Sequence, residues 1–168
     1  KIIDTPHSHA SAESAVALVR TGHARALMKG ALHTDEVMSA VVAKENGLRS
    51  ERRMSHVYVM DVPTYSKPLM ITDAAINIAP DLQTKADMIQ NAIDLAHAIG
   101  IELPKVAILS AVETITPRLQ STIEAGALCK MADRGQITGG LLDGPLAFDH
   151  AISMRAVAAK EIASDVAG

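Results

Sequence analysis

The sequence predicts an α/β protein with a mixed, mostly parallel β-sheet. Short apolar runs alternate along its 168 residues with longer segments of helical periodicity, a pattern typical of βαβ units. Aromatic residues make up 2% of the chain, so we expect a core of Ala, Val, Ile, Leu and the eight Met. The length suits one large domain or two small ones. A sub-domain boundary can be placed near Pro80, with residues 1–80 in a first α/β sub-domain and residues 81–168 in a second.

The first quarter of the chain is expected to contain two helices with a strand between them. Apolar spacing and punctuating residues place a helix over 11–21, a buried strand over 25–28, a turn over 29–33 and a helix from Thr34 to near Asn46. Asp35 and Glu36 come directly after Thr34. Hydroxyl and carboxylate groups satisfy free amides at a helix start and favour the positive end of its dipole. Thr34 is therefore predicted to open and cap the second helix.

Two strand-like segments follow, over 55–60 and 69–72. The connection between them, Pro63 to Pro68, is too short to hold a crossover helix. The two strands are therefore expected to form an antiparallel hairpin, which makes the sheet mixed rather than wholly parallel.

The second half of the chain alternates regularly between helix and strand, after a non-periodic stretch over 73–82. The longest helix opens at Thr84 and is ended by Gly100. The later elements are expected as a strand over 105–109, a helix over 117–131, a strand over 137–142 and a helix over 151–164.

Charge and hydropathy limit the classes of partner. The 16 basic and 19 acidic residues give a net charge of -3, which provides no electrostatic footprint for a nucleic acid. No apolar run approaches the roughly 18 residues needed to cross a bilayer. The single cysteine, Cys129, fits a reducing compartment. We therefore expect no nucleic-acid partner, no membrane partner and a cytoplasmic location.

The turn after the first expected strand is a candidate anion site. It combines the cation Lys29, the flexible Gly30 and the imidazole of His33 with a helix that begins at Thr34. A helix start supplies free amides to an anion. An ordinary strand-to-helix turn capped by Thr34 explains the same residues equally well.

Asp73 and Asn77 follow the hairpin, at the sheet edge where open α/β proteins bind ligands. Asp73 can accept a proton or a hydrogen bond from a ligand. Alternatively, it can cap the turn through its own backbone. The length of this loop and its many small residues favour a functional role.

Further polar residues follow the later strands. Ser110 and Glu113 come after the strand over 105–109, although a lone loop carboxylate is usually only solvated. Asp143 and Gly144 come after the strand over 137–142, although an Asp-Gly-Pro turn is also common structural punctuation.

The sequence contains no recognisable metal or nucleotide motif. Its seven His are not arranged at metal-ligand spacing, so no metal site is predicted. Neither GxGxxG after a strand nor GxxxxGK[ST] occurs, and these are the usual signals of dinucleotide and nucleoside triphosphate sites. Cys129 lies in an Ala-, Leu- and Met-rich segment without a partnered His, and we expect a buried, inert thiol.

Several blocks of the sequence are more informative together than alone. They are MKGALHTD from Met28, LR from Leu48, SHV from Ser55, ITDAAINIAPDL from Ile71, KVAILSAVE from Lys105, MADRGQITGG from Met131 and DGPLAFD from Asp143. In this order, and over nearly the whole chain, they resemble the phosphate acetyltransferase and phosphate butyryltransferase family. The resemblance is greatest with the butyryltransferase-like branch, including the form fused to an enoyl-CoA hydratase-like domain.

The resemblance implies a reversible reaction in which acyl-CoA and inorganic phosphate give acyl phosphate and CoA. It also implies a three-layer α/β/α fold like that of isocitrate and isopropylmalate dehydrogenases, an active site in a cleft, and a homodimer. The CoA thioester would be a substrate, and no separate cofactor is expected.

The resemblance also implies roles for individual residues. The expected catalytic residues are His33, Asp73 and Ser110. The expected phosphate- or substrate-binding residues are Lys29, Gly30, Thr34, Asn77, Asp143 and Gly144.

Two departures from the family pattern favour an alternative. Family members usually carry an arginine on the helix after the His-Thr turn, where this chain reads Val37-Met38-Ser39-Ala40. Their chains also continue past the point that corresponds to Gly168, with Ser-Arg and acidic residues assigned to thiol handling, and they have a further amino-terminal βα portion. We therefore expect a fragment that is inactive alone, or a non-catalytic CoA- or phosphate-binding module of a larger protein. A hydroxy-acid dehydrogenase of the same fold is disfavoured, because it needs a metal-binding carboxylate cluster and a nicotinamide site.

Overall fold

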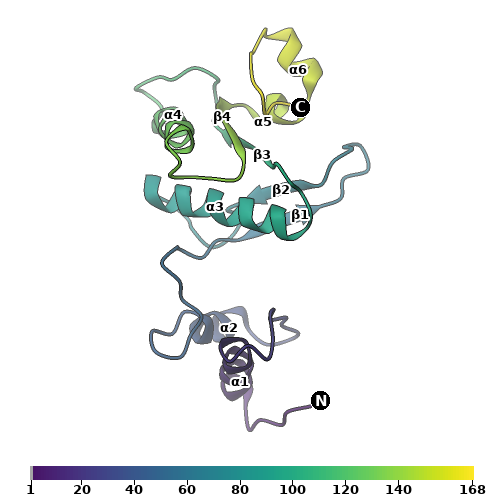
Figure 1. Ribbon diagram of the computed structural model, residues 1–168, viewed down its shortest axis with the longest axis vertical. Helices are drawn as coiled ribbons and strands as arrows, with labels where there is room; N and C mark the ends of the chain where they lie inside the picture. The colour runs from purple at the N-terminus through teal and green to yellow at the C-terminus, as the bar shows by residue number, and fades with distance from the viewer. Residues whose placement is uncertain (1) are drawn as a thin grey trace. The chain divides into compact units, whose positions relative to one another are not determined.

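A computed structural model describes residues 2–168, which form two compact units. The first unit ends at Arg52, and the second unit is Arg53–Gly168. The chain is a mixed α/β protein in which the strands all belong to the second unit, as far as the described residues go (Figure 1). The sub-domain boundary expected near Pro80 stays a prediction.

Two helices make up the regular structure of the first unit, α1 (Ser8–Arg20) and α2 (Thr34–Val41). They pack against each other, and the buried side chains of α1 are Ala12 and Val16. The start of α1 is tied to α2, because the hydroxyl of Ser8 donates a 2.6 Å hydrogen bond to the carboxylate of Glu36.

The expected strand over 25–28 is not formed, and Met28 is 100% exposed. A strand is stable only beside another strand, and the described part of the first unit contains no second one. The helix does begin at Thr34 as predicted, but it ends at Val41 rather than near Asn46. A turn in which the amide of Leu48 donates to the carbonyl of Val41 replaces its expected last part.

The second unit begins with the predicted antiparallel hairpin. Strands β1 (Val57–Met60) and β2 (Leu69–Thr72) pair in the register that puts Val57 opposite Thr72. This confirms the prediction drawn from the short, proline-bounded connection.

The core of the second unit lies between two helices and a parallel pair of strands. Helix α3 (Leu82–Ala98) and helix α4 (Gln120–Asp133) accompany strands β3 (Lys105–Leu109) and β4 (Leu141–Leu146) (Figure 1). The buried core consists of aliphatic side chains and contains no aromatic residue, as the composition predicts. Its members are Ala86, Ile89, Ile93, Leu128 and Ile137.

Three expectations for the second unit need correction. The hairpin and the parallel pair form two separate two-stranded sheets rather than one mixed sheet in the described chain. Strand β4 begins at Leu141 rather than at residue 137, because Gly139 has φ 86° and turns the chain before the strand. The expected helix over 151–164 is two short helices, α5 (Phe148–Ile152) and α6 (Met154–Ala159), because Ser153 between them is extended.

None of the helices within residues 2–168 combines the length and the apolar character needed to cross a membrane.

Candidate functional site

Strand β2 leads directly into the loop that contains Asp73, and the carboxylate of Asp73 organises this loop. One carboxylate oxygen accepts hydrogen bonds from the backbone amides of Ala75 and Ile76, at 2.9 and 3.0 Å. The other accepts from the backbone amide of Asn77 at 3.1 Å and from its side-chain amide. The peptide bond between Thr72 and Asp73 is cis.

These hydrogen bonds decide the ionisation of Asp73. Partial burial raises its pKa, but the amides of Ile76, Ala75 and Asn77 favour the charged form more strongly and lower the pKa to about 2. A carboxylate with so low a pKa and four donors is a weak proton acceptor. Of the two alternatives that the sequence left open for Asp73, the geometry favours capping of the turn.

Asn77 connects the same loop to the segment before β1. Its side-chain amide donates to the carbonyl oxygen of Met54 over 3.0 Å as well as to Asp73. Beside it, the hydroxyl of Thr72 donates to the carbonyl oxygen of His56 over 2.9 Å. The loop after β2 is therefore fixed to the chain that enters the hairpin.

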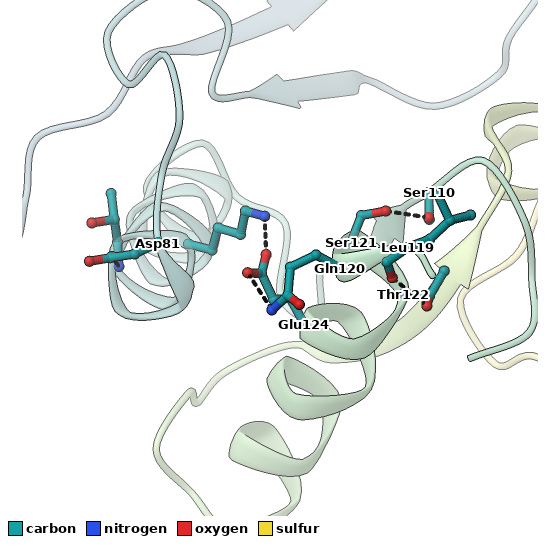
Figure 2. A network of polar contacts seen from close by, with 9 residues as sticks. Asp81, Ser110, Leu119, Gln120, Ser121, Thr122 and Glu124 are labelled. Carbon is teal, nitrogen blue, oxygen red and sulfur yellow. Dashed lines mark hydrogen bonds and ion pairs between the residues drawn. The ribbon is translucent and has the colours of Figure 1, made fainter. Parts of the chain in front are cut away.

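Ser110 lies at the carboxyl end of β3, as expected, and is held by both its backbone and its side chain. Its amide donates to the carbonyl oxygen of Leu146 in β4, and its hydroxyl lies 2.8 Å from that of Ser121 in α4. Figure 2 shows this pair of hydroxyls at one end of α4. Ser110 is thus locked to both neighbouring elements of its own unit.

The start of α4 carries a second group of polar contacts, between α4 and α3. The carboxylate of Glu124 accepts a hydrogen bond from Gln120 and forms an ion pair with Lys85 (Figure 2). The hydrogen bond from Lys85 lowers the pKa of Glu124 despite an opposing effect of burial. These contacts fix the helix from which Ser121 reaches Ser110.

Asp143 and Gly144 lie inside β4 rather than after it. Asp143 pairs with Ala107 across the parallel sheet, and its carboxylate accepts a 2.8 Å hydrogen bond from the amide of Gly144. A β-carbon at Gly144 would lie 2.7 Å from the carbonyl oxygen of Ile108, so this position requires the close approach that glycine allows.

Cys129 of α4 contacts the same strand, with its sulfur 3.8 Å from the carbonyl oxygen of Gly144. Burial raises the pKa of the Cys129 thiol to about 11, and this thiol is partly rather than wholly covered. A protonated thiol is a poor nucleophile, which agrees with the inert role predicted from the sequence.

The candidate anion residues of the first unit lie on an exposed turn. The ammonium group of Lys29 donates to the carbonyl oxygen of Leu32 over 2.9 Å. The N-cap of α2 is His33, and no side chain caps this helix, so Thr34 does not have the expected capping role. The first amides of α2 are left to water or to a ligand. Gly30, His33 and Thr34 are all exposed.

The predicted site residues therefore fall into two groups. Lys29, Gly30, His33 and Thr34 belong to the first unit, and the others belong to the second. Within the second unit, Asp73 and Asn77 are in direct contact through a hydrogen bond.

Sequence reasoning missed one pair, Glu113 and His150, which it treated as an isolated carboxylate and an isolated imidazole. The structure brings them together, with Nδ1 of His150 2.8 Å from Oε1 of Glu113. The available signal was that each residue follows one of two parallel strands, at the edge where such residues meet.

No three His, Cys, Asp or Glu side chains of residues 2–168 gather closely enough to hold a metal ion. The expectation of no metal site stays a prediction.

Comparison with known proteins identifies the family of the chain. The family described as phosphate acetyl/butaryl transferase matches residues 5–168. The chain belongs to this phosphate acyltransferase family. The expected resemblance to this family is thereby confirmed, and the matched range includes every residue predicted for the site.

The curated relatives of this chain include both phosphate acetyltransferases and phosphate butyryltransferases. It is 64% identical over 168 residues to a phosphate acetyltransferase of Rhizobium meliloti, covering 100% of this chain and 53% of the relative. It is 45% identical to a phosphate butyryltransferase of Clostridium acetobutylicum, covering 100% of this chain and 56% of the relative. The chain thus spans about half the length of these relatives, and its identity is higher with the relative named for the acetyl group.

Solved structures of the family share the fold. A branched-chain phosphotransacylase from Enterococcus faecalis matches with a TM-score of 0.88 and 33% identity, over 100% of this chain and 60% of that one. A phosphotransacetylase from Streptococcus pyogenes matches with a TM-score of 0.74 and 26% identity, over 95% of this chain and 48% of that one.

Proposed function

We propose that the full-length protein that contains this chain transfers an acetyl or butyryl group between CoA and inorganic phosphate. The observation that carries this proposal is the family match over residues 5–168. In the forward direction, a phosphate oxygen attacks the thioester carbonyl, a C–O bond forms, the C–S bond breaks, and the departing sulfur takes a proton. The products are acyl phosphate and CoA.

This reaction places three demands on a site. The phosphate anion must be held near the carbonyl, the oxyanion of the tetrahedral intermediate needs hydrogen-bond donors, and a group must manage the proton of the thiol. No covalent enzyme intermediate is required, so Cys129 need not react.

In this proposal the first unit binds phosphate. Lys29 supplies a cation, and the uncapped start of α2 at His33 and Thr34 supplies free amides. Gly30 lets the turn bring its backbone close to the anion. The imidazole of His33 would act as a hydrogen-bond donor or proton carrier.

The second unit contributes groups that bind and orient the acyl-CoA. Ser110 would donate a hydrogen bond to substrate, and Asn77, Asp143 and Gly144 would line the cleft. Asp73 would act by fixing the loop that carries Asn77, because its own oxygens already accept four hydrogen bonds.

Finer features of the complete protein are part of the same proposal. It would have the three-layer α/β/α fold of the isocitrate and isopropylmalate dehydrogenases, form a homodimer in the cytoplasm, and bind neither nucleic acid nor membrane. The CoA thioester would serve as a substrate, without an additional cofactor.

A non-catalytic CoA- or phosphate-binding module is the second candidate. It is favoured by one observation, the apolar and small residues Val37–Ala40 on α2 where family members usually carry an arginine. A dehydrogenase of similar fold remains disfavoured, and an absorbance change on addition of NAD and a hydroxy acid would revive it.

The test is release of free thiol from acetyl-CoA and from butyryl-CoA by the full-length protein, with and without phosphate. We expect phosphate-dependent release with at least one thioester and formation of the matching acyl phosphate. If the protein binds CoA but releases no thiol with either thioester, the binding module is the correct function.

A further inference from the structure

The second unit contains a buried histidine that the proposed reaction does not use. The side chain of His150, in α5 just after β4, is 1% exposed. Its Nδ1 lies 2.8 Å from Oε1 of Glu113, which belongs to the loop just after β3. Since β3 and β4 are parallel neighbours, the pair lies at the carboxyl edge of their sheet.

Other charged groups surround this pair. The ammonium group of Lys160, at the end of α6, lies 3.3 Å from the same Oε1 of Glu113. Asp149 places a carboxylate oxygen 3.6 Å from Nδ1 of His150, but its side chain is 66% exposed. Glu113 thus lies beside the side chains of His150 and Lys160, which come from two different elements, and its own side chain is 21% exposed.

The contact of Glu113 with His150 is an electrostatic one. Nδ1 has no partner in hydrogen-bond geometry, although the carboxylate oxygen is only 2.8 Å away. A buried polar nitrogen without a hydrogen bond destabilises a fold unless a charge compensates it. Partial burial raises the pKa of Glu113, but its own backbone amide, Lys160 and His150 outweigh this effect and lower the pKa. The ionised carboxylate of Glu113 therefore faces the buried Nδ1 of His150.

The position of Glu113 in the chain gives the pair its significance. The loop from residue 110 to 119 is anchored at its start by the hydrogen bond from Ser110 to Leu146. It is anchored near its end by the buried hydroxyl of Thr122, which bonds to both backbone groups of Thr116. Between these two anchors, Glu113 fastens the loop to α5 and α6.

We infer that His150 is a positioning residue: through Glu113 it holds the loop after β3, and with it Ser110, in the conformation that acyl transfer uses. The inference rests on the proposed function for its reaction, and on the Glu113–His150 geometry for its mechanism. His150 itself touches no reacting atom in this account.

The variants are chosen to separate the effect of the ring nitrogens of His150 from the effect of the space that its side chain fills. His150→Leu removes the ring nitrogens and keeps an apolar side chain in the buried position. His150→Asn retains a nitrogen close to the place of Nδ1 and serves as the conservative variant. Glu113→Gln keeps the volume of the carboxylate and removes its charge. His97→Leu is the matched control, because His97 is an exposed histidine of α3 that bonds to Gly139.

The first readout is steady-state kinetics of the full-length protein. We expect His150→Leu and Glu113→Gln each to lower kcat about tenfold while the KM for phosphate stays within about twofold. The kcat of the double variant is expected to lie within about twofold of that of either single variant, because both substitutions remove the same interaction. His150→Asn should recover at least about half of the lost activity, and His97→Leu should match the unaltered protein.

The second readout is hydrogen exchange of the amides of residues 111–115, which needs no enzymatic activity. We expect exchange about fivefold faster in His150→Leu and Glu113→Gln than in His97→Leu. If His150→Leu does not fold, both the kinetics and the hydrogen exchange are measured on Glu113→Gln and His150→Asn instead.

The outcomes distinguish this inference from the proposed function. Unchanged exchange of residues 111–115 in Glu113→Gln would overturn the positioning role, whether or not the protein is an acyltransferase. An active protein whose kcat does not change in these variants would overturn it as well. Absence of phosphate-dependent thiol release from the unaltered protein would refute the proposed function, and with it the link to acyl transfer, while faster exchange would still support the anchoring of the loop.

Discussion

In the second unit, candidate site residues are fixed by several hydrogen bonds each. In the first unit, the candidate residues lie on an exposed turn. Asp73 accepts four hydrogen bonds, and Ser110 is fixed through both its backbone and its hydroxyl. Lys29, by contrast, bonds to carbonyl oxygens of its own turn, and α2 begins without a side-chain cap. The difference separates two kinds of candidate residue: those of the second unit, whose hydrogen bonds maintain its fold, and those of the first unit, which remain available for an anion.

The largest effect on stability is expected at Asp73. Replacing it with alanine leaves the amides of Ala75, Ile76 and Asn77 without their acceptor, and should lower the free energy of unfolding by about 3 kcal/mol. Urea unfolding of the full-length protein measures this. Asp81→Ala is the matched control, because Asp81 caps α3 by accepting a 2.8 Å hydrogen bond from the backbone amide of Thr84, and its loss should cost only about 1 kcal/mol. Equal losses for the two variants would contradict the organising role of Asp73.

The next largest effect is expected at Thr122, whose side chain is wholly buried. Its hydroxyl accepts from the amide of Thr116, and its single proton lies within hydrogen-bond distance of two carbonyl oxygens, those of Thr116 and Leu119. Thr122→Val keeps the shape and removes these bonds, so we expect a loss of about 2 kcal/mol in the free energy of unfolding. The substitution Ser121→Ala, on the preceding residue of α4, should cost less, and the reverse order would count against the network at the start of this helix.

Acid should weaken the second unit through Asp73. Its pKa is lowered from 3.8 to about 2 in the folded protein, so its carboxylate contributes stability that is complete above about pH 4 and is lost as the pH falls through about 2. Allowing for solvent screening, this contribution is about 1 kcal/mol. The melting temperature of the unaltered protein should therefore fall more between pH 4 and pH 2 than that of Asp73→Asn. Parallel curves for the two proteins would show that Asp73 does not titrate in this way.

The smallest of these effects is expected at Glu124. Its ion pair with Lys85 connects α3 and α4, but both side chains are partly exposed, so Glu124→Gln should cost less than about 1 kcal/mol. The cost should shrink further in 1 M salt, because exposed charges are screened there. A loss larger than that of Asp81→Ala would mean that the helix pair depends on this contact more than its exposure suggests.

The sequence predicted the local elements better than their assembly. The hairpin follows from a proline-bounded connection too short for a helix, and β3 and α3 follow from apolar periodicity. These are signals carried by neighbouring residues. The strand expected over 25–28 fails because a strand also depends on a partner that local periodicity cannot reveal, and β4 starts late because Gly139 adopts a positive φ.

The same limit applies to the site. Asp73 and Asn77 lie four residues apart, so a turn-capping contact between them was foreseeable from their spacing. Glu113 and His150 are separated by 37 residues and meet only because β3 and β4 are parallel neighbours. A pairing that depends on strand order cannot be derived from either residue's local sequence.

The division between fold-maintaining and anion-binding residues is tested most directly by the kinetics of Lys29→Ala in the full-length protein. Lys44→Ala is the control, because Lys44 is another exposed lysine of the first unit. We predict that Lys29→Ala lowers kcat/KM for phosphate about a hundredfold while the melting temperature stays within about 1 °C of the control. Wild-type kcat/KM for phosphate in Lys29→Ala, or a loss of activity fully explained by unfolding, would contradict this account.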